Sequence, residues 1–594
     1  MPPPGACLNI MEARQKQRGY GTFANPERFL NQDYQQLKQH CVTRGVMYVD
    51  DMFPPDAVSI GEGILRPSDL CRVQWLRPMK LSPFPNFILD GISRFDVGQG
   101  VLGDCWFLAS LAALTLQPQI FEKVVPVDQT FDAKYCGLFH FRFWRFGKWV
   151  DVVIDDKLPT IDGRLLFAHS KDQNEFWPAL MEKAYAKVCG SYTDMVTGTP
   201  AEAMMDFTGG VHISVELSDP PPNLWQLMCS AGQSSSLMGC GTPQGTPDNN
   251  ILANGLVQGH AYTVTGMKQV ASRGKPVKLL RLMNPWGKGE WTGAWSDLSP
   301  LWKTLSVEDR AALLSVADNG EFWLTLEDFC KFYTDLDICS LSPNFLDGNF
   351  SRQWETTVYE GRWVAGTTAG GCSNNRDSFW TNPQYRVKIS GEHSGNEKNV
   401  LLSLMQKHDK RNRHLIQNFH IGISVFEHKA QKGKFPPSFF NQAPAGQTKT
   451  YRNAREVVEY LTLKPAEYLI VPSTFRPNEA ASFLLTIITK EKTDGDLKSG
   501  GFSIEACRSM VALMDVSSWG GCCIIYVYRF IPPVIPLPSL MALRYGASSG
   551  HITLESFIGL ILRLDCMSKI FKQLSDGKNM NLQESEVTKH SVQQ

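Results

Sequence analysis

A run of apolar and small residues begins at Cys105, directly after a glycine-rich turn at Gln99–Gly103. The residues that follow recur at helical spacing: Leu108, Ala109, Ala112 and Ala113. This spacing predicts a buried helix that begins at or near Cys105. The same periodicity predicts a second helix over 176–188 and a short one over 33–40.

Strand-like runs surround these helices. Two of them, 137–144 and 149–154, follow the Cys105 helix, and two more span 259–266 and 277–284. The last two are separated by turn residues at 272–276, so we predict that they form a hairpin. The stretch 230–250 is rich in Pro, Gly and Ser and is expected to be a loop.

Beyond residue 341 the pattern changes to short strands between turn signals, which is typical of an all-β sandwich. The strands are expected at 357–363, 384–389, 400–406, 421–426, 467–471 and 482–488. Helical patterns return at 502–514 and 553–574. We therefore predict an α+β chain in five parts: an N-terminal segment (1–44), two core subdomains (45–200 and 201–341), the sandwich (342–491) and a helical end (492–594).

Composition narrows the class of protein. The 594 residues carry no net charge, so no basic field argues for a nucleic-acid partner or an anionic membrane. The run 410–414 is basic, but it is expected to be a solvated strand edge or turn. The 15 cysteines are scattered without a CxxC pair, and residues 1–21 contain no apolar signal sequence. A reduced, cytoplasmic protein is expected.

Cys105 is the first candidate for chemistry. A thiol at a helix N-terminus lies in the positive end of the helix dipole, which favours the thiolate. Buried structural cysteines are commoner than reactive ones, and a single His on a strand is usually a satisfied core residue. A nucleophilic cysteine needs a base and a residue that orients the base. His260 lies in the strand expected at 259–266, and Asn284 lies at the end of the strand expected at 277–284. The predicted hairpin of these two strands could place the two side chains next to each other.

The order Cys, His, Asn is that of papain-like proteases. Gln99, six residues before Cys105, would supply a side-chain N–H beside the backbone N–H of Cys105. Two donors at that point form an oxyanion hole for a tetrahedral intermediate.

Several longer stretches resemble the calpain protease core. They are 99–106, 174–187, 206–210, 259–266, 284–287, 290–297 and 320–323. The resemblance runs from about Gln35 to Leu341 and continues into a calpain-type β-sandwich, where 359–363 and 368–371 match.

The resemblance implies a papain-like two-subdomain fold and a calcium-activated intracellular endopeptidase that makes limited cuts in protein substrates. It assigns Cys105 as the nucleophile, His260 as the general base and acid, Asn284 as the orienting residue and Gln99 as the oxyanion donor. Trp286 matches a tryptophan that separates the subdomains without calcium and shields the catalytic hydrogen bonds once the cleft closes.

The resemblance also implies one Ca²⁺ site in each subdomain, built from the oxygen ligands that Ca²⁺ prefers. The first set comprises the carbonyls of Leu89 and Gly91 and the carboxylates of Asp96 and Glu175. The second comprises Glu290, Asp297, the carbonyl of Ala317, Asn319 and Glu321. An acidic residue is usual where Asn319 stands, so we expect weaker binding there. Arg94 and Glu321 match a pair that links the two sites.

Two regions depart from the family pattern. The sandwich loop at 391–398 is nearly neutral where a strongly acidic loop is expected, so only weak membrane association through the sandwich is anticipated. The chain after the sandwich resembles pieces of a penta-EF-hand domain, at 501–515 and 565–582. Trp519 and Tyr526 stand where a calcium loop needs oxygen ligands. About 100 residues do not accommodate five hands, so a small regulatory subunit is not expected.

Two other functions remain open at this point. A calpain-like protein with weak proteolysis could act by binding, through the sandwich and the C-terminal region, and the fragmentary EF-hand pattern and Asn319 favour it. A transglutaminase-like acyl transferase shares Cys/His chemistry, but an Asp would be expected in place of Asn284. The intact set of Cys105, His260, Asn284 and Gln99 favours the protease.

Overall fold

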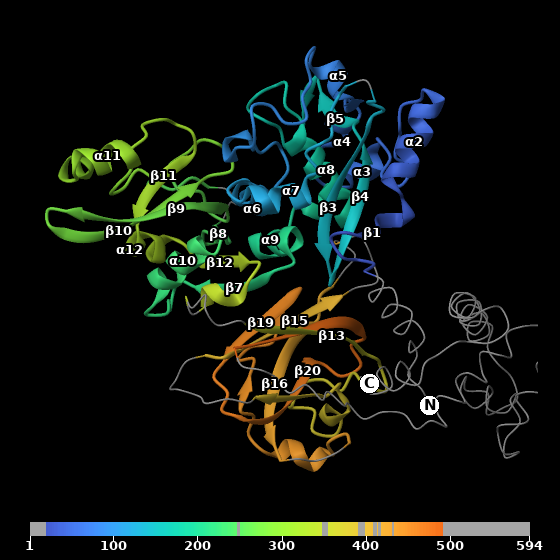
Figure 1. Cartoon of the computed structure of the whole chain (residues 1–594), viewed down its shortest axis with the longest axis vertical. Coiled ribbons are helices and arrows are strands. Elements are labelled where there is room, and N and C mark those ends of the chain that lie inside the picture. Colours follow the sequence, from blue (N-terminus) through green and yellow to red (C-terminus); the bar gives the residue numbers. More distant parts are fainter. Residues whose placement is uncertain are drawn as a thin grey trace, which may run out of the picture. The chain divides into compact units, whose positions relative to one another are not determined.

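The computed structural model describes residues 19–490 except 133, 246–249, 347, 349–353, 390–397, 408–412, 414–416 and 430–432. These residues form two compact units. The first unit contains Gly21–Thr357 and Met405–Asn418, and the described part of the second contains 19–20, Val358–Leu404 and 419–490 (Figure 1). The helices predicted at 502–514 and 553–574 and most of the loop at 391–398 lie outside the described residues.

The predicted helix at Cys105 is confirmed and is buried along its length. It is α6 (Cys105–Thr115), and every residue after Cys105 is buried. The turn before it packs closely, because a Cβ on Gly100 would lie 2.3 Å from the Leu166 carbonyl oxygen. Only glycine fits there. Helix α6 packs against α9 (Pro200–Thr208) and strand β9 (Ala261–Ser272).

The other predicted helices of the first unit are also confirmed, with shifted ends. The helix expected at 176–188 is α8 (Trp177–Cys189), which is buried throughout, and the one at 33–40 is α2 (Tyr34–Arg44), capped by the Asp33 side chain. Shorter helices complete the unit: α3 (Ala57–Ile60), α4 (Pro67–Leu70), α5 (Pro78–Leu81), α7 (Pro118–Val124), α10 (Leu224–Gln233), α11 (Val307–Leu313) and α12 (Leu326–Phe332). No helix in the described part of the chain is long and apolar enough to cross a membrane.

Two small sheets flank α8. One has the order β1 (Glu27–Arg28), β4 (Lys148–Asp155), β3 (Leu138–Arg145), and the other β2 (Gln74–Leu76), β5 (Leu158–Ile161), β6 (Arg164–Leu165). Strands β3 and β4 confirm the runs predicted at 137–144 and 149–154 and pair antiparallel.

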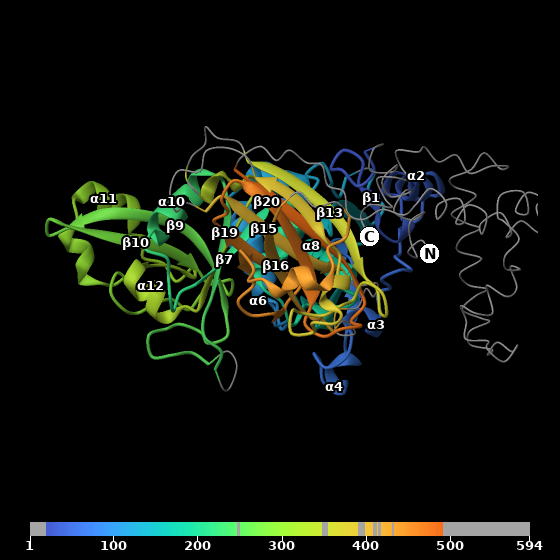
Figure 2. The same cartoon turned by 90° about the horizontal axis from the view of Figure 1, so that it is seen from below.

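A six-stranded antiparallel sheet forms the other half of the first unit (Figure 2). Its order is β11 (Glu321–Thr325), β10 (Lys275–Met283), β9, β8 (Leu237–Gly241), β12 (Asp335–Ser340), β7 (Val211–Glu216). The predicted hairpin is β9–β10, in which Ser272 pairs with Lys275 across a two-residue turn. Both turn residues, Arg273 and Gly274, have positive φ, as type I′ hairpin turns require.

The loop expected at 230–250 was a wrong prediction over part of its length. It contains the end of α10 and the whole of β8, which pairs with β9 and β12. Strand β8 reads Leu-Met-Gly-Cys-Gly, and four of its five residues are buried. A short strand that contains two glycines carries little β-propensity, and neighbours on both sides supply its stability.

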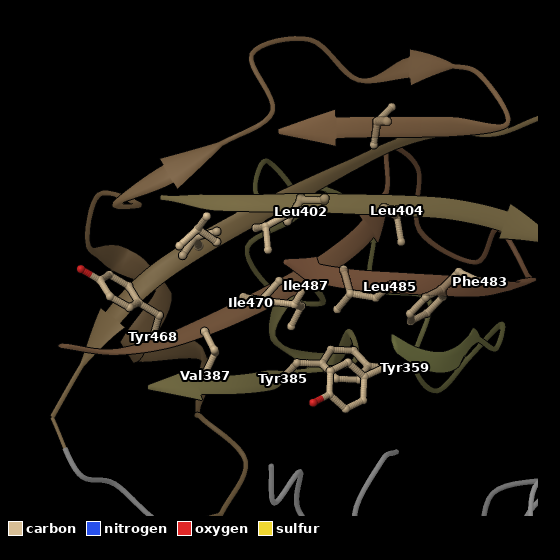
Figure 3. Close-up of a cluster of buried hydrophobic side chains, with 14 of the residues drawn as sticks. Tyr359, Tyr385, Val387, Leu402, Leu404, Tyr468, Ile470, Phe483, Leu485 and Ile487 are labelled. Atoms are coloured by element: carbon tan, nitrogen blue, oxygen red, sulfur yellow. The ribbon is translucent and has the colours of Figure 1, made fainter. Parts of the chain in front are cut away.

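The second unit is a β-sandwich. One sheet has the order β13 (Glu355–Trp363), β21 (Ala481–Thr489), β15 (Val400–Lys407), β19 (Glu456–Leu461). The other has β14 (Tyr385–Ile389), β20 (Ala466–Thr474), β16 (His420–His428), β17 (Gly446–Gln447), with β18 (Arg452–Asn453) on β16. All six predicted strands are present. Figure 3 shows the inward-facing side chains, among them Leu402, Ile470 and Leu485, that form the core.

Candidate active site

Helix α6 places the Cys105 thiol at its first residue, half-buried. Burial raises the pKa of the thiol to about 11, and the negative charge of Asp104 adds to the shift. The main-chain N–H of Ala261, within hydrogen-bonding reach of the sulfur, partly opposes it. The expectation that the helix dipole would favour a thiolate is therefore wrong for this arrangement, because desolvation outweighs the dipole. The resting sulfur is a thiol.

The sheet brings the main chain next to His260 to Cys105. His260 lies directly before β9, so the Ala261 N–H that contacts the sulfur belongs to its neighbour in sequence. The Thr263 hydroxyl donates to the Ala109 carbonyl at 2.6 Å and fastens β9 to α6. His260 was expected on a strand and Asn284 at a strand end. Both lie one residue outside their strands, where side chains are free of the strand pleat.

Asn284 fixes the orientation of the His260 ring. Its Nδ2 donates to the carbonyls of Lys288 and Gly289 at 3.0 and 3.1 Å, so its Oδ1 must be an acceptor. That oxygen lies 2.8 Å from Nε2 of His260 and also accepts the Trp286 N–H. Nε2 therefore carries the proton. Nδ1 is buried and has no hydrogen-bond partner among the described residues, so its lone pair is free to accept a proton.

The imidazole is neutral. Burial lowers the pKa of His260 to about 4, and the hydrogen bond that its Nε2–H donates to Asn284 opposes this shift only in part. The indole of Trp286 lies over the ring, with 4.7 Å between the ring centroids. Trp286 thus contacts the ring that it is expected to shield, and the shielding role itself stays a prediction.

Gln99 lies in the turn before α6, with its side chain directed along that turn. Its Nε2 donates to the Leu102 carbonyl at 2.7 Å, and its Oε1 is buried without a hydrogen-bond partner in the described chain. One N–H of the amide is thereby fixed, and the second remains for a substrate oxygen.

Arg413 is a residue near the site that sequence reasoning missed. Its guanidinium lies 5.1 Å from the centre of the Trp106 ring and 2.6 Å from a carboxylate oxygen of Glu202. The basic run 410–414 was expected to be solvated, and Arg413 shows that this was wrong for at least one member. Its neighbours in space are more than 200 residues away in sequence, so no local pattern could indicate them.

The first predicted calcium set lies around Glu175. One oxygen of this buried carboxylate accepts the Leu89 N–H at 2.9 Å, and the other accepts the Ser170 hydroxyl at 2.7 Å. Burial and the nearby Asp96 charge raise the pKa of Glu175 to about 7. Gly91 occupies a turn with a φ of 94° that a side chain would strain. A buried carboxylate and a half-buried one that repel each other fit a cation site.

The second predicted set is organised by the loop 317–321. Glu290 accepts the N–H groups of Asn319 and Gly320, each at 2.9 Å, and Asp297 accepts the Ala317 N–H at 3.2 Å. Burial raises the pKa values of Glu290 and Asp297, and each is raised further by a nearby carboxylate. These repelling carboxylates also fit a cation, with carbonyl and amide oxygens completing the set.

Glu321 is engaged by other partners. Its two oxygens accept from Nε and Nη2 of Arg94 at 2.7 and 2.9 Å, as the predicted pair requires, and Thr265 donates to it as well. These partners lower its pKa. Among the described residues no three His, Cys, Asp or Glu side chains cluster closely enough to hold a metal alone, so main-chain and amide oxygens are needed at both sets.

Comparison with known proteins agrees with this geometry. The family model described as calpain family cysteine protease matches residues 48–340, and that of calpain large subunit, domain III, matches 359–488. The calpain-1 catalytic subunit of Mus musculus is 39% identical, over 86% of this chain and 82% of its own length. The calpain-2 catalytic subunits of Bos taurus and Homo sapiens are 40% and 34% identical, over 96% of this chain and 97% of theirs.

Proposed function

We propose, on the premise that this chain belongs to the calpain family of cysteine proteases, that it hydrolyses peptide bonds in protein substrates with Cys105, His260 and Asn284. The chain is thereby a calcium-dependent cysteine endopeptidase by family. The observation that carries the triad is the orientation of Asn284, which leaves Nδ1 of His260 as the one nitrogen able to accept a proton.

The reaction follows from that assignment. Nδ1 of His260 takes the thiol proton as Cys105 Sγ attacks the carbonyl carbon, which gives a tetrahedral oxyanion and an imidazolium. The imidazolium returns the proton to the leaving amine, and a thioester to Cys105 remains. A water then gives a proton to His260 and attacks the thioester, and the acid product and the thiol are released. The Cys105 N–H and the second amide N–H of Gln99 stabilise the oxyanion.

Asn284 acts through the ring. It holds Nε2–H throughout, so His260 exchanges its proton only at Nδ1, and the imidazolium form keeps the Asn284 oxygen as its acceptor. Because the resting pair is a neutral thiol and a neutral imidazole, proton transfer and attack must be coupled. This feature also supports the alternative of a weak protease that acts mainly by binding.

We infer that the two carboxylate sets hold Ca²⁺: Leu89, Gly91, Asp96 and Glu175 in one, and Glu290, Asp297, Ala317, Asn319 and Glu321 in the other. When bound, Ca²⁺ supplies positive charge that relieves repulsion among these carboxylates and favours the arrangement in which Cys105 meets His260. The ten described cysteines are all free thiols, which supports the proposal of a reducing, cytoplasmic setting.

A casein or fluorogenic-peptide assay with and without millimolar Ca²⁺ tests the function. We expect Ca²⁺-dependent turnover by the wild type, none by Cys105→Ala, and wild-type turnover by the control Cys71→Ala, which removes an exposed thiol. Turnover that survives Cys105→Ala would overturn the assignment of the nucleophile. No turnover by folded wild-type protein would favour the binding alternative.

A further inference from the structure

Asp104, which directly precedes Cys105, has a carboxyl group that the proposed reaction does not use. The residue is fully buried, and its main-chain carbonyl accepts the N–H groups of Phe107 and Leu108 at 2.9 and 3.1 Å, in the first turn of α6. Its side chain does not cap the helix. Among the described residues, neither carboxyl oxygen receives a well-formed hydrogen bond from a main-chain N–H group or a hydroxyl group. A buried carboxylate without donors is costly, so some other partner must satisfy it.

That partner is Glu182, on α8. It is 1% exposed, and both of its oxygens lie within hydrogen-bonding distance of the Ala168 N–H, at 3.0 and 2.9 Å. The side chains of Asp104 and Glu182 are in hydrogen-bond contact. An ionised carboxylate only accepts hydrogen bonds. Two carboxyl groups can therefore bond to each other only if one of them keeps its proton.

The surroundings favour proton retention. Burial is the largest cause that raises the pKa of Asp104, to about 7, and it also raises that of Glu182, to which Asp104 adds a like charge. The titratable groups that face the pair are Cys105 and Tyr192, which burial keeps neutral. Asp155, the next carboxylate, is bound by Lys183 at 2.6 Å. No cationic side chain of the described residues acts on Asp104 or Glu182.

We propose that Asp104 and Glu182 share a single proton, and that this hydrogen bond is a positioning device that fixes the N-terminal end of α6 against α8. Glu182 donates the shared proton to Asp104 and accepts the Ala168 N–H. Through Glu182, the turn before Cys105 is thus joined both to α8 and to the segment that contains Ala168. The proposal rests on the proposed function in one respect, that Cys105 is the nucleophile whose place is fixed. Neither carboxyl group touches substrate.

Three consequences follow. The alignment of Sγ with Nδ1 of His260 depends on the shared proton, so activity falls when the pair loses it. Because these carboxyl groups have raised pKa values in the folded protein, the stability they contribute is fully present below their pKa values in the unfolded chain, about 4, and is lost as the pH rises through the raised values, about 7 for Asp104 and well above the usual range for Glu182. The negative charge left on Asp104 also opposes thiolate formation at Cys105.

Glu182→Gln is the decisive variant. The amide N–H₂ can donate to Asp104 and the amide oxygen can accept the Ala168 N–H, but the group cannot lose a proton. We expect kcat/KM at neutral pH to equal that of the wild type and the alkaline limb of its pH profile to move upward or vanish. Glu182→Ala should lower kcat/KM by about 10²-fold, as a misplaced nucleophile does. Glu122→Gln, at an exposed position on α7, is the matched control. It should change neither kcat/KM nor the alkaline limb of the pH profile.

Two readouts do not depend on protease activity. At neutral pH the infrared C=O stretch of a protonated buried carboxylic acid should appear in the difference spectrum of wild type minus Glu182→Gln, in which the contribution of Glu175 cancels. In thermal unfolding, the stability of the wild type should decrease above neutral pH more steeply than the stability of Glu182→Gln. If the wild type shows the band but no turnover, the proposed function fails and the proton-sharing pair stands.

The opposite results overturn the inference. A wild type without the carboxylic band, or a Glu182→Gln variant with the same alkaline limb as the wild type, means that no proton is shared. A Glu182→Gln variant that is as inactive as Glu182→Ala, while circular dichroism shows both folded, means that hydrogen-bond donation to Asp104 does not position Cys105. If Glu182→Ala does not fold, the Glu182→Gln comparisons still decide the matter.

Discussion

The guanidinium of Arg413 lies over the indole of Trp106, 5.1 Å from the ring centre, and Trp106 directly follows Cys105 in α6. Trp106 is also held at its ring edge, because its Nε1 donates to the Met195 carbonyl at 2.8 Å. Gly198 packs so closely on the same ring that a Cβ there would lie 2.4 Å from it. The residue after the nucleophile is thus fixed by partners from two separate segments of the first unit, 195–198 and the loop that contains Arg413.

Replacing Arg413 should therefore destabilise the first unit. Arg413→Ala removes both the stacked cation and the partner of Glu202, and we expect a loss of about 2 kcal/mol in unfolding free energy. Arg413→Lys keeps the charge but not the planar group, and should recover about half of that loss. Chemical denaturation followed by tryptophan fluorescence measures both. Equal stability of the wild type and Arg413→Ala would show that the contact contributes nothing.

Asn284 should matter more for catalysis than for folding. Asn284→Ala removes the acceptor that holds the His260 proton on Nε2, and we expect kcat/KM to fall by 10²–10⁴-fold, a range like that of other triad orienting residues, with about 1–2 kcal/mol of lost stability. Peptide-hydrolysis kinetics and thermal unfolding measure the two effects. Asn284→Asp is the matched comparison, since a carboxylate still accepts from Nε2 and should raise the pKa of His260. Activity of Asn284→Ala near that of the wild type would remove Asn284 from the triad.

The lowered pKa of His260 predicts an acid-sensitive fold. A His in the unfolded chain titrates near 6.5, and in the folded chain His260 titrates at about 4. The neutral imidazole thus contributes stability above pH 6.5, and this contribution is lost as the pH falls from about 6.5 to about 4. Thermal unfolding between these values should show a slope that is reduced in His260→Asn. An identical slope in both proteins would contradict the burial of a neutral imidazole.

The thiol should react slowly at neutral pH without calcium. Its pKa of about 11 predicts that the rate of Cys105 alkylation by iodoacetamide rises continuously from pH 7 to pH 10. The assay is made in the Cys71→Ala background, with mass spectrometry of the peptide that contains Cys105. A rate that is already maximal at pH 7 would show a preformed thiolate.

Asn319→Asp should lower the Ca²⁺ concentration needed for half-maximal activity. The new carboxylate keeps the oxygen that accepts the Glu321 N–H at 2.9 Å and adds a charge beside Glu290 and Asp297. Calcium titration of peptide hydrolysis measures the shift. Asn478→Asp in the sandwich is the control, since that amide oxygen also accepts a main-chain N–H, from Gly366 at 2.8 Å, far from either set in sequence. Equal shifts in both variants would point to overall charge instead of a site.

Local patterns predicted much of this fold. The helix at Cys105, the hairpin and the six sandwich strands carry periodic apolar residues and turn signals that do not depend on distant parts of the chain. Strand β8 was not predicted because its pairing with β9 and β12, and not its own residues, stabilises it as a strand. Local patterns also did not predict the pKa of Cys105 or the position of Arg413, because both are set by segments far away in sequence.

The β9–β10 hairpin has a practical consequence. His260 and Asn284 lie at its base, whereas its turn at Arg273–Gly274 is exposed and extends away from α6 in both views (Figures 1 and 2). A fluorophore or a short peptide tag inserted at that turn would be covalently joined to the His–Asn half of the site through two strands, yet would touch none of its atoms. The turn is thus a natural attachment point for an optical reporter of movement between the nucleophile and its base.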